Sequence, residues 1–363
     1  MSTVAKDGIE SALSEIVDPH TGVDLVAGKS LKDCVVDDQS ILIDLVLGYP
    51  AKGWHPKLKQ QVVDTISQLG NIQSVEVRIE TQVVSHEVQK GVTPLKNVRN
   101  VIAVASGKGG VGKSTVSANL ALALSVEGAN VGVLDADIYG PSQPRMLGIG
   151  GRPESKDGKS LEPMSNYDVQ VMSIGFLIEE DTPMIWRGPM VTQALEQLLQ
   201  DTKWRDLDYL IIDLPPGTGD IQLTLAQKVP VSGAVIVTTP QDIALLDARK
   251  AIKMFEKVEI PVLGIVENMS THVCTNCGYE EHIFGEGGGR RMADEYGVGH
   301  LGDIPLDVRI REDSDSGRPT VVANSDGSLA EAYRTIARNT SGVLSARKRD
   351  YSEVFPSIVI QNS

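Results

Sequence analysis

The sequence predicts an α/β protein in which a doubly wound, mostly parallel sheet follows a small α-β-β-α-β two-layer domain. Three observations support this prediction. Short apolar runs suited to buried strands alternate with helical patterns from Val101 onward. A glycine-rich turn at residues 107–115 joins the first of these runs to a helix. Residues 1–84 carry their own, separate set of helix and strand patterns.

Length and composition limit the possible classes of protein. A chain of 363 residues is long enough for two domains with sizeable cores. Its 48 acidic and 34 basic residues give a formal net charge of −14, which argues against sequence-independent nucleic-acid binding. The N-terminus lacks an apolar signal core, and the chain lacks a run of about 18 apolar residues. We therefore expect a cytoplasmic protein that binds neither nucleic acid nor membrane.

The first 84 residues predict a small two-layer domain. The expected elements are a helix through Ile9, Leu13 and Ile16, strands at 31–36 and 41–47, a helix through Leu58, Val62, Ile66 and Leu69, and a strand at 72–79. Cys34 lies within an apolar strand pattern, which favours a buried structural thiol over a metal ligand. Residues 85–100 are polar and aperiodic, so we expect a linker there.

The second domain is expected to span residues 101–342. Its predicted strands are 101–105, 129–135, 169–174, 209–214, 234–239 and 261–267, and its predicted later helices are 191–200, 221–227, 244–257, 289–296 and 329–338. This alternation is typical of a parallel sheet with helices on both faces. We expect residues 343–363 to form a solvated tail with one added strand at 357–360.

The turn after the first of these strands fits the pattern G-x-x-x-x-G-K-[ST]. Its glycines let successive backbone N–H groups point into one hollow that suits a polyphosphate. Lys113 would reach the β- and γ-phosphates of ATP, and the Ser114 hydroxyl would join the shell of Mg²⁺. The candidate nucleotide-binding residues are Gly107, Lys108, Gly109, Gly110, Val111, Gly112, Lys113, Ser114 and Thr115. An ordinary glycine-rich turn is the alternative, but the preceding strand and following helix favour nucleotide binding.

Carboxylates end two of the predicted strands. Asp213 follows an apolar run, which is the Walker B arrangement for holding Mg²⁺ directly or through water. Asp135 and Asp137 end another run, and the carboxyl edge of a doubly wound sheet is where ligands bind. Gly217 lies where a backbone N–H could sense a γ-phosphate. The alternative for each Asp is that it only begins a loop.

Cys274 and Cys277 form a C-x-x-C pair in an insert after the last of these strands. A tetrahedral metal or an iron–sulfur cube needs four ligands, and this pair supplies two. A symmetric dimer would bring two pairs together around one [4Fe–4S] cluster. Zinc held by the pair with His272 and His282 is an alternative, and a dithiol redox pair is another.

The second lysine of the glycine-rich turn, Lys108, indicates which class of phosphate-loop protein the chain resembles. The segment Lys-Gly-Gly-Val-Gly-Lys-Ser-Thr resembles the deviant Walker motif of the MinD, ParA and nitrogenase-iron-protein class. The resemblance implies that Lys108 acts on the nucleotide of a partner subunit. It further implies that Asp137 orients the attacking water, that Asp135 supports the Mg²⁺ shell, and that Asn268 recognises the adenine edge.

Taken together, the motifs resemble the Mrp/ApbC family of iron–sulfur carrier ATPases. The segments that carry this likeness are the phosphate loop, Asp-Ala-Asp-Ile-Tyr-Gly-Pro-Ser, Asp-Leu-Pro-Pro-Gly-Thr-Gly-Asp, Glu-Asn-Met-Ser, the C-x-x-C pair and Phe-Gly-Glu-Gly-Gly-Gly. The small domain resembles one that often precedes iron–sulfur assembly ATPases. Thr275 and Asn276 depart from the Pro-His pair expected between the cysteines.

This resemblance implies a homodimeric, slow, Mg²⁺-dependent ATPase. Such a protein would bind a [4Fe–4S] cluster between its subunits and pass it to apo iron–sulfur proteins, in contact with cluster assembly scaffold proteins. Two alternatives stay open at this point. One is a MinD- or ParA-like spatial-positioning ATPase, and the other is a zinc-stabilised regulatory ATPase.

Overall fold

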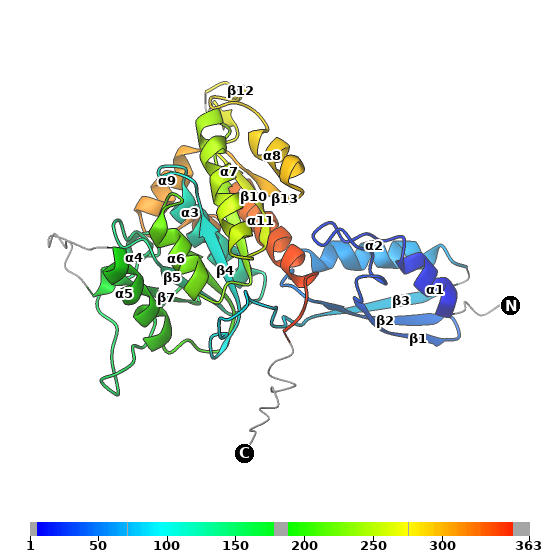
Figure 1. The fold of residues 1–363 in the computed structure, drawn as a ribbon. Helices are drawn as coiled ribbons and strands as arrows, with labels where there is room; N and C mark the ends of the chain where they lie inside the picture. The colour runs from blue at the N-terminus through cyan, green and yellow to red at the C-terminus, as the bar shows by residue number, and fades with distance from the viewer. Residues whose placement is uncertain (1–5, 71, 178–187, 275, 351–363) are drawn as a thin grey trace, which may run out of the picture.

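The computed structural model describes residues 6–70, 72–177, 188–274 and 276–350. They form a small N-terminal domain with a three-stranded sheet and a large domain built on an eight-stranded sheet (Figure 1). A two-stranded hairpin projects from the large domain. The predicted α/β fold class, with a large, mostly parallel sheet behind a small domain, is confirmed.

The small domain has the predicted α-β-β-α-β order. Its elements are α1 (Lys6–Leu13), β1 (Leu31–Asp37), β2 (Ser40–Leu47), α2 (His55–Ser67) and β3 (Ser74–Thr81). Strand β2 lies in the centre, antiparallel to β1 and parallel to β3. Its alternate residues Ile41, Ile43, Leu45 and Leu47 are buried in the core of this domain, as strand periodicity requires. Helix α2 ends at Ser67, so Leu69 lies beyond it.

The large sheet has the order β13-β10-β9-β4-β8-β5-β7-β6. Its strands are β4 (Val98–Ala105), β5 (Val131–Asp135), β6 (Met164–Asn166), β7 (Val169–Ser173), β8 (Leu207–Asp213), β9 (Gly233–Thr238), β10 (Val262–Asn268) and β13 (Gly299–Ile304). All the paired strands run parallel except β6, which is antiparallel to β7. The central strands are almost entirely buried because both faces of the sheet are covered.

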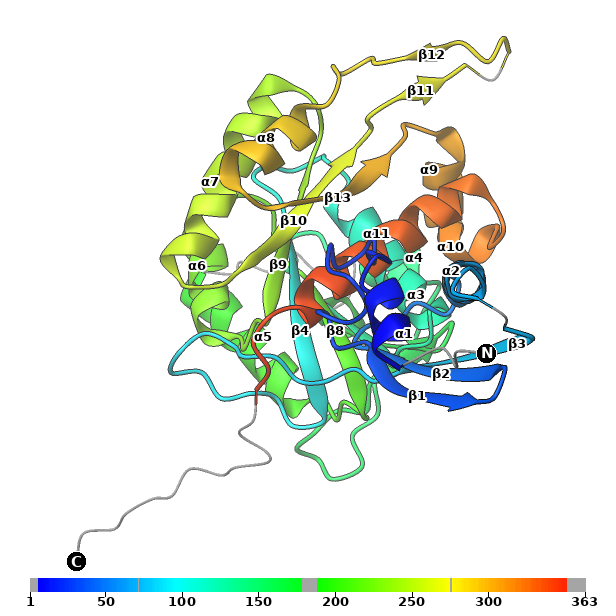
Figure 2. The ribbon, with the colours of Figure 1, turned by 90° about the vertical axis from the view of Figure 1, so that its right-hand side faces the viewer.

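Helices cover both faces of the large sheet. They are α3 (Lys113–Val126), α4 (Gln143–Met146), the 3₁₀ turn η1 (Ile174–Phe176), α5 (Gly188–Asp201), α6 (Asp220–Lys228), α7 (Asp242–Lys257), α8 (Gly288–Tyr296), α9 (Val308–Asp315), α10 (Thr320–Ala323) and α11 (Ser328–Ser345). Figure 2 shows α6 and α7 on one side of the strands and α3 and α11 on the other. Because these strands run parallel, their carboxyl ends lie at the same edge of the sheet, and the loops that follow them form the candidate functional site.

Several elements differ from those predicted. Strand β13, the short β6 and the helices α4, α9 and α10 were not expected from the sequence. Strand β4 begins at Val98, inside the predicted linker, and α11 continues to Ser345. The strand expected at 357–360 lies outside the described residues.

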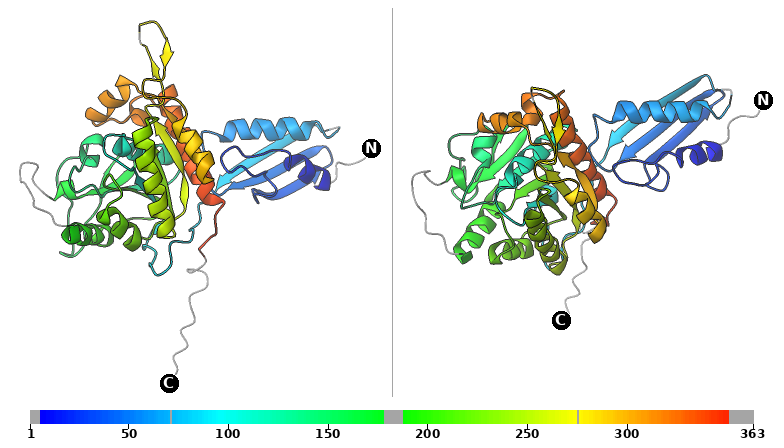
Figure 3. Two further views of the ribbon diagram at one scale, coloured as in Figure 1. Left: turned by 45° about the horizontal axis from the view of Figure 1, so that its top comes forward. Right: turned by 90° about the horizontal axis from the view of Figure 1, so that it is seen from above.

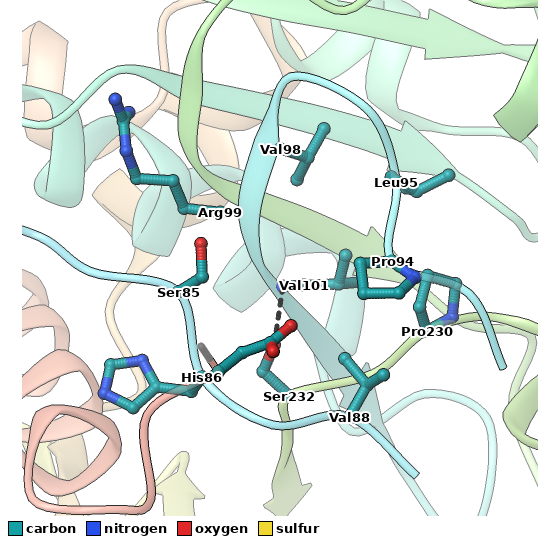
Figure 4. Close-up of a pocket in the computed structure, with 11 residues that line it drawn as sticks. Ser85, His86, Val88, Pro94, Leu95, Val98, Arg99, Val101, Pro230 and Ser232 are labelled. Carbon is teal, nitrogen blue, oxygen red and sulfur yellow. Dashed lines mark hydrogen bonds between the residues drawn. The ribbon is translucent and has the colours of Figure 1, made fainter. Parts of the chain in front are cut away.

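The segment between the domains packs against the large sheet. Pro94, Leu95 and Val98 surround a hollow of about 30 Å³ beside Pro230 (Figure 4). At the same place, the backbone N–H of Val101 donates to the Ser232 hydroxyl at 3.2 Å. The hollow is about large enough for one water molecule, so this part of the connection is closely packed.

A buried polar contact joins the two domains. The carboxylate of Glu127, just after α3, accepts a hydrogen bond from the Gly53 N–H at 2.7 Å and pairs with Arg338 of α11 at 3.3 Å. His20 Nδ1 lies 2.6 Å from Asn339 Oδ1 on the same helix. The small domain is therefore docked on the end of α3 and on α11.

Candidate functional site

The glycine-rich loop lies between β4 and α3 at the carboxyl edge of the large sheet. Gly110 and Gly112 have φ of 81° and 85°, which favour glycine. A Cβ on Gly107 would lie 2.1 Å from the Asp247 backbone carbon of α7, and one on Gly112 would lie 2.2 Å from Asn268 Nδ2. Both the conformation and the close packing of the loop therefore require glycine.

Lys113, the first residue of α3, lies against the carboxylates that the sequence predicts to meet it. Its Nζ is 2.7 Å from Asp213 Oδ1 and 3.9 Å from Asp137 Oδ2. Ser117, one turn further along α3, donates to the same Asp213 oxygen at 2.8 Å. Strands β4, β5 and β8 lie side by side, and this adjacency brings the loop and the two strand-end carboxylates together.

Gln143 belongs to the same cluster and was not predicted. Its Nε2 donates to Asp213 Oδ2 at 2.9 Å and to the Ser114 carbonyl at 3.0 Å. Its Oε1 is buried and finds no hydrogen-bond partner in the part of the chain that the structure describes. The one signal for it in the sequence is its place six residues after Asp137, in the turn that starts α4.

Asp135 is fully buried beneath this cluster. It accepts hydrogen bonds from the backbone N–H groups of Asp137, Ser142 and Gln143 and from the Ser173 hydroxyl. Burial raises the pKa of Asp135 to about 7, and the neighbouring Asp213 carboxylate adds to the shift. Burial also raises the pKa of Asp137, with Lys113 opposing it. One lysine thus faces three carboxylates.

The donor set at this edge fits Mg²⁺. It offers carboxylate oxygens from Asp213 and Asp135 and the Ser114 hydroxyl, which are hard oxygen ligands. The Ser142 hydroxyl oxygen, like Gln143 Oε1, is buried without a hydrogen-bond partner among the described residues. The excess of carboxylates over Lys113 leaves negative charge that a divalent cation would balance.

Three predicted residues have defined places but untested roles. Asn268, at the end of β10, donates from Nδ2 to the Val111 carbonyl of the loop at 2.8 Å. The Gly217 N–H donates to the Ser106 carbonyl at 2.9 Å, with Gly217 at a φ of 101°. Lys108 is half-buried, and none of the described residues forms an ion pair with it. Adenine recognition, phosphate sensing and action in a partner subunit stay predictions.

The two cysteines lie in the turn of a hairpin formed by β11 (His272–Val273) and β12 (Glu280–Glu281). Figures 2 and 3 show this hairpin apart from the other elements of the large domain. Cys277 is exposed and Cys274 is half-buried. The backbone N–H of Asn276, followed by that of Cys277, lowers the pKa of the Cys274 thiol. This favours the thiolate, which is the form that binds metal.

Among the described residues, the cysteines of the hairpin and the nearby histidines are not grouped into a metal site. His272 Nδ1 lies 3.1 Å from the Leu306 carbonyl, and His282 Nδ1 lies 3.1 Å from the Ser270 carbonyl. Over the described ranges, no three His, Cys, Asp or Glu side chains are grouped to hold a metal ion. Cys34 is buried in the core of the small domain, as predicted, and burial raises its pKa.

Comparison with known proteins identifies the family. Residues 97–341 match the family described as NUBPL iron-transfer P-loop NTPase, and residues 6–79 match the family described as iron-sulfur cluster assembly protein. The chain belongs to the iron-transfer P-loop NTPase family. The predicted resemblance to the deviant Walker class and to iron–sulfur carrier ATPases is confirmed at the level of the family.

Individual relatives agree with this family. An iron-sulfur cluster carrier protein of Pseudomonas fragi is 59% identical, over 75% of this chain and 96% of its own. A nucleotide-binding protein of Archaeoglobus fulgidus, solved in complex with ADP, is 40% identical with a TM-score of 0.56, over 65% of this chain and 93% of its own. The cell division ATPase MinD of Pyrococcus furiosus shares the fold, with 23% identity and a TM-score of 0.51 over 66% of this chain and 97% of its own.

None of the helices in the described parts of this iron-transfer NTPase is both long and apolar enough to cross a membrane.

Proposed function

We propose that this chain is an ATPase that carries a [4Fe–4S] cluster on Cys274 and Cys277 and transfers it to apo iron–sulfur proteins. One observation carries the proposal. The cysteine pair lies in an exposed turn just beyond β10, and β10 ends at Asn268, which is hydrogen-bonded to the phosphate loop. The cargo ligands and the nucleotide loop are therefore joined through one strand.

The residues proposed for hydrolysis would suit a phosphate-bearing substrate. Loop N–H groups and the Lys113 ammonium would bind the β- and γ-phosphates of ATP, which requires Lys113 to exchange part of its contact with Asp213. Asp137 would orient the attacking water, since its carboxylate lies beside Lys113. Gln143 would hold the Asp213 carboxylate in place through its amide.

Mg²⁺ bound by Ser114 and Asp213, with Asp135 in support, would neutralise phosphate charge during hydrolysis. The protein's part is to fix these oxygens, and it does so by burying both carboxylates and saturating Asp135 with hydrogen bonds. Lys108 would complete the site from a second subunit. Dividing the site between two subunits would make hydrolysis slow.

The cluster requires a dimer. One chain offers two thiols at the hairpin, and its third cysteine, Cys34, is buried in the small domain. A cubane cluster takes four cysteine ligands, which two hairpins related by a two-fold axis would supply. Val273, Tyr279 and Ile283 flank the cysteines in the sequence and are large, exposed apolar side chains. An interface between subunits would cover them and exclude water from the cluster.

Nucleotide would control the release of the cluster through the base of the hairpin. Ser270 donates its N–H to the Ile304 carbonyl, and Leu306 donates its N–H to the Thr271 carbonyl. These contacts hold the hairpin to the end of β13, while Asn268 holds β10 to the loop. Movement of the phosphate loop on hydrolysis would be transmitted to the cysteines through the few residues that follow Asn268. Cluster assembly scaffold proteins would load the dimer, and apo-proteins would receive the cluster.

Anaerobic reconstitution with iron and sulfide tests the ligand assignment. The Cys274→Ser/Cys277→Ser protein should lose the bound iron and its charge-transfer absorption, while a Cys34→Ala control should keep both. Metal analysis of protein purified without oxygen should find iron rather than zinc. Unchanged iron content in the double serine variant would sink the assignment of these two ligands.

A further inference from the structure

The small domain meets the C-terminal end of α11 (Figure 1). A second hollow lies at this junction. It has a volume of about 530 Å³. The small domain contributes residues from 21–32 and 46–49, and the large domain contributes residues 345–349. A Cβ on Gly48 would lie 3.3 Å from the Ser345 Cβ, so glycine allows the two walls to approach closely. The hollow therefore exists only while the domains are docked.

The lining of this hollow is basic although the protein is acidic. Lys29, Lys32, Arg347 and Arg349 line it, and the described residues that line it include no Asp or Glu. Lys32 forms an exposed ion pair with Glu80 at 3.2 Å. In the described part of the chain, none of Lys29, Arg347 and Arg349 has an ion-pair partner. On a chain with a net charge of −14, this is a local concentration of positive charge.

Size and chemistry together indicate the class of ligand. Pockets for small molecules occupy about 300 to 1,000 Å³ and occur preferentially between domains. Guanidinium groups match the planar geometry of carboxylate and phosphate oxygens, and lysines add point charges. Tyr49 and Val46 supply apolar surface to the same lining, which suits an organic ligand more than a bare ion.

We propose that this junction hollow binds a small organic or inorganic polyanion bearing phosphate or carboxylate groups. Lys29 and Lys32 hold it from the small domain, and Arg347 and Arg349 hold it from the segment after α11. The ligand bridges the two domains and strengthens the docking that Glu127 and Arg338 already provide. This site is separate from the phosphate loop and the cysteine hairpin, and the proposal does not depend on the carrier function.

Calorimetric titration of the full chain with citrate and with tripolyphosphate tests the proposal. Citrate probes carboxylates and tripolyphosphate probes phosphates, so the anion whose binding weakens in the variants of the hollow identifies the chemistry. The Arg347→Gln/Arg349→Gln protein should bind that anion at the hollow at least about tenfold more weakly. The Lys29→Gln/Lys32→Gln protein should show a comparable loss. Binding of tripolyphosphate at the phosphate loop is common to all these proteins, so the differences between them report on the hollow.

The control is Lys57→Gln/Lys59→Gln, which removes two exposed charges from α2 of the same domain. It should bind as the unaltered protein does. All four substituted side chains in the hollow are exposed, so the melting temperature without anion should be unchanged in every variant. Two results would overturn the proposal: no citrate binding up to about 10 mM together with tripolyphosphate binding that the variants of the hollow leave unchanged, or equal affinity for both anions in the arginine variant and the control.

Discussion

The phosphate loop and the cysteine hairpin differ in how completely one chain builds them. At the loop, Lys113, Asp135 and Asp213 are buried and held in a network of hydrogen bonds. At the hairpin, two thiols lie in a turn, one of them exposed, with no third ligand grouped beside them among the described residues. One chain can thus organise most of the residues proposed for hydrolysis, but it holds only two of the four ligands that the proposed cluster needs.

Substitution of Lys113 should have the largest effect, because it should impair ATP hydrolysis at the phosphate loop and leave iron binding at the hairpin unchanged. In Lys113→Ala, the phosphates lose their buried cation, so ATP hydrolysis should fall by about 10³-fold or more. Iron content after reconstitution should stay unchanged, because the hairpin lies outside the network of Lys113. The measurements are phosphate release and iron per chain, with the exposed Lys253→Ala as control. A normal rate of hydrolysis in Lys113→Ala would contradict the assignment of the loop.

Mixing two inactive variants tests whether the loop also needs a second chain. Lys108→Ala and Lys113→Ala should each lack activity. If Lys108 acts across the dimer, random exchange of subunits should restore about a quarter of the normal hydrolysis rate, since half of the dimers then contain one intact site. If Lys108 acts within its own chain, the mixture should stay inactive, and the loop would be complete in one subunit.

Gln143 is proposed to hold the buried Asp213 carboxylate in place. Gln143→Leu keeps approximate size but removes the amide that joins Asp213 to the Ser114 carbonyl. Loss of such a support for a metal ligand reduces metal affinity or activity by about 10- to 100-fold. The Mg²⁺ concentration needed for half-maximal hydrolysis should rise, whereas the exposed Gln197→Leu on α5 should behave normally. An unchanged Mg²⁺ dependence would make Gln143 a packing residue only.

Asp135 should give the smallest effect, visible in the pH dependence of stability. Its folded pKa of about 7 lies above the ordinary value of 3.8, so the folded protein keeps a proton that the unfolded chain has released. The stability contributed by this proton is full below about pH 4 and is lost as the pH rises to about 7. The free energy of unfolding, relative to Asp135→Asn, should fall across that interval. A rise would contradict the burial argument.

Local spacing explains what could be predicted from the sequence. The phosphate loop and the strand-end Asp residues were found because glycine positions and apolar runs are encoded within a few neighbouring residues. Strand β13 (Gly299–Ile304) was missed because two of its six residues are glycine, which has a low strand propensity. Its pairing with β10 stabilises it instead.

Contacts between distant parts of the chain were not predictable from one sequence. Gln143 contacts Asp213 across 70 positions, and Glu127 meets Arg338 only after α3 and α11 have packed together. No periodicity or motif marks such pairs, since nothing in the sequence near either residue indicates its partner. The docking of the small domain and the basic hollow beside it follow from those contacts.

Native mass spectrometry of the anaerobically reconstituted protein decides whether two chains share one cluster. We predict a species with the mass of two chains plus one [4Fe–4S] cluster, and its absence from the Cys274→Ser/Cys277→Ser protein. A cluster-loaded species with the mass of a single chain would contradict the account, because all the ligands would then come from one polypeptide.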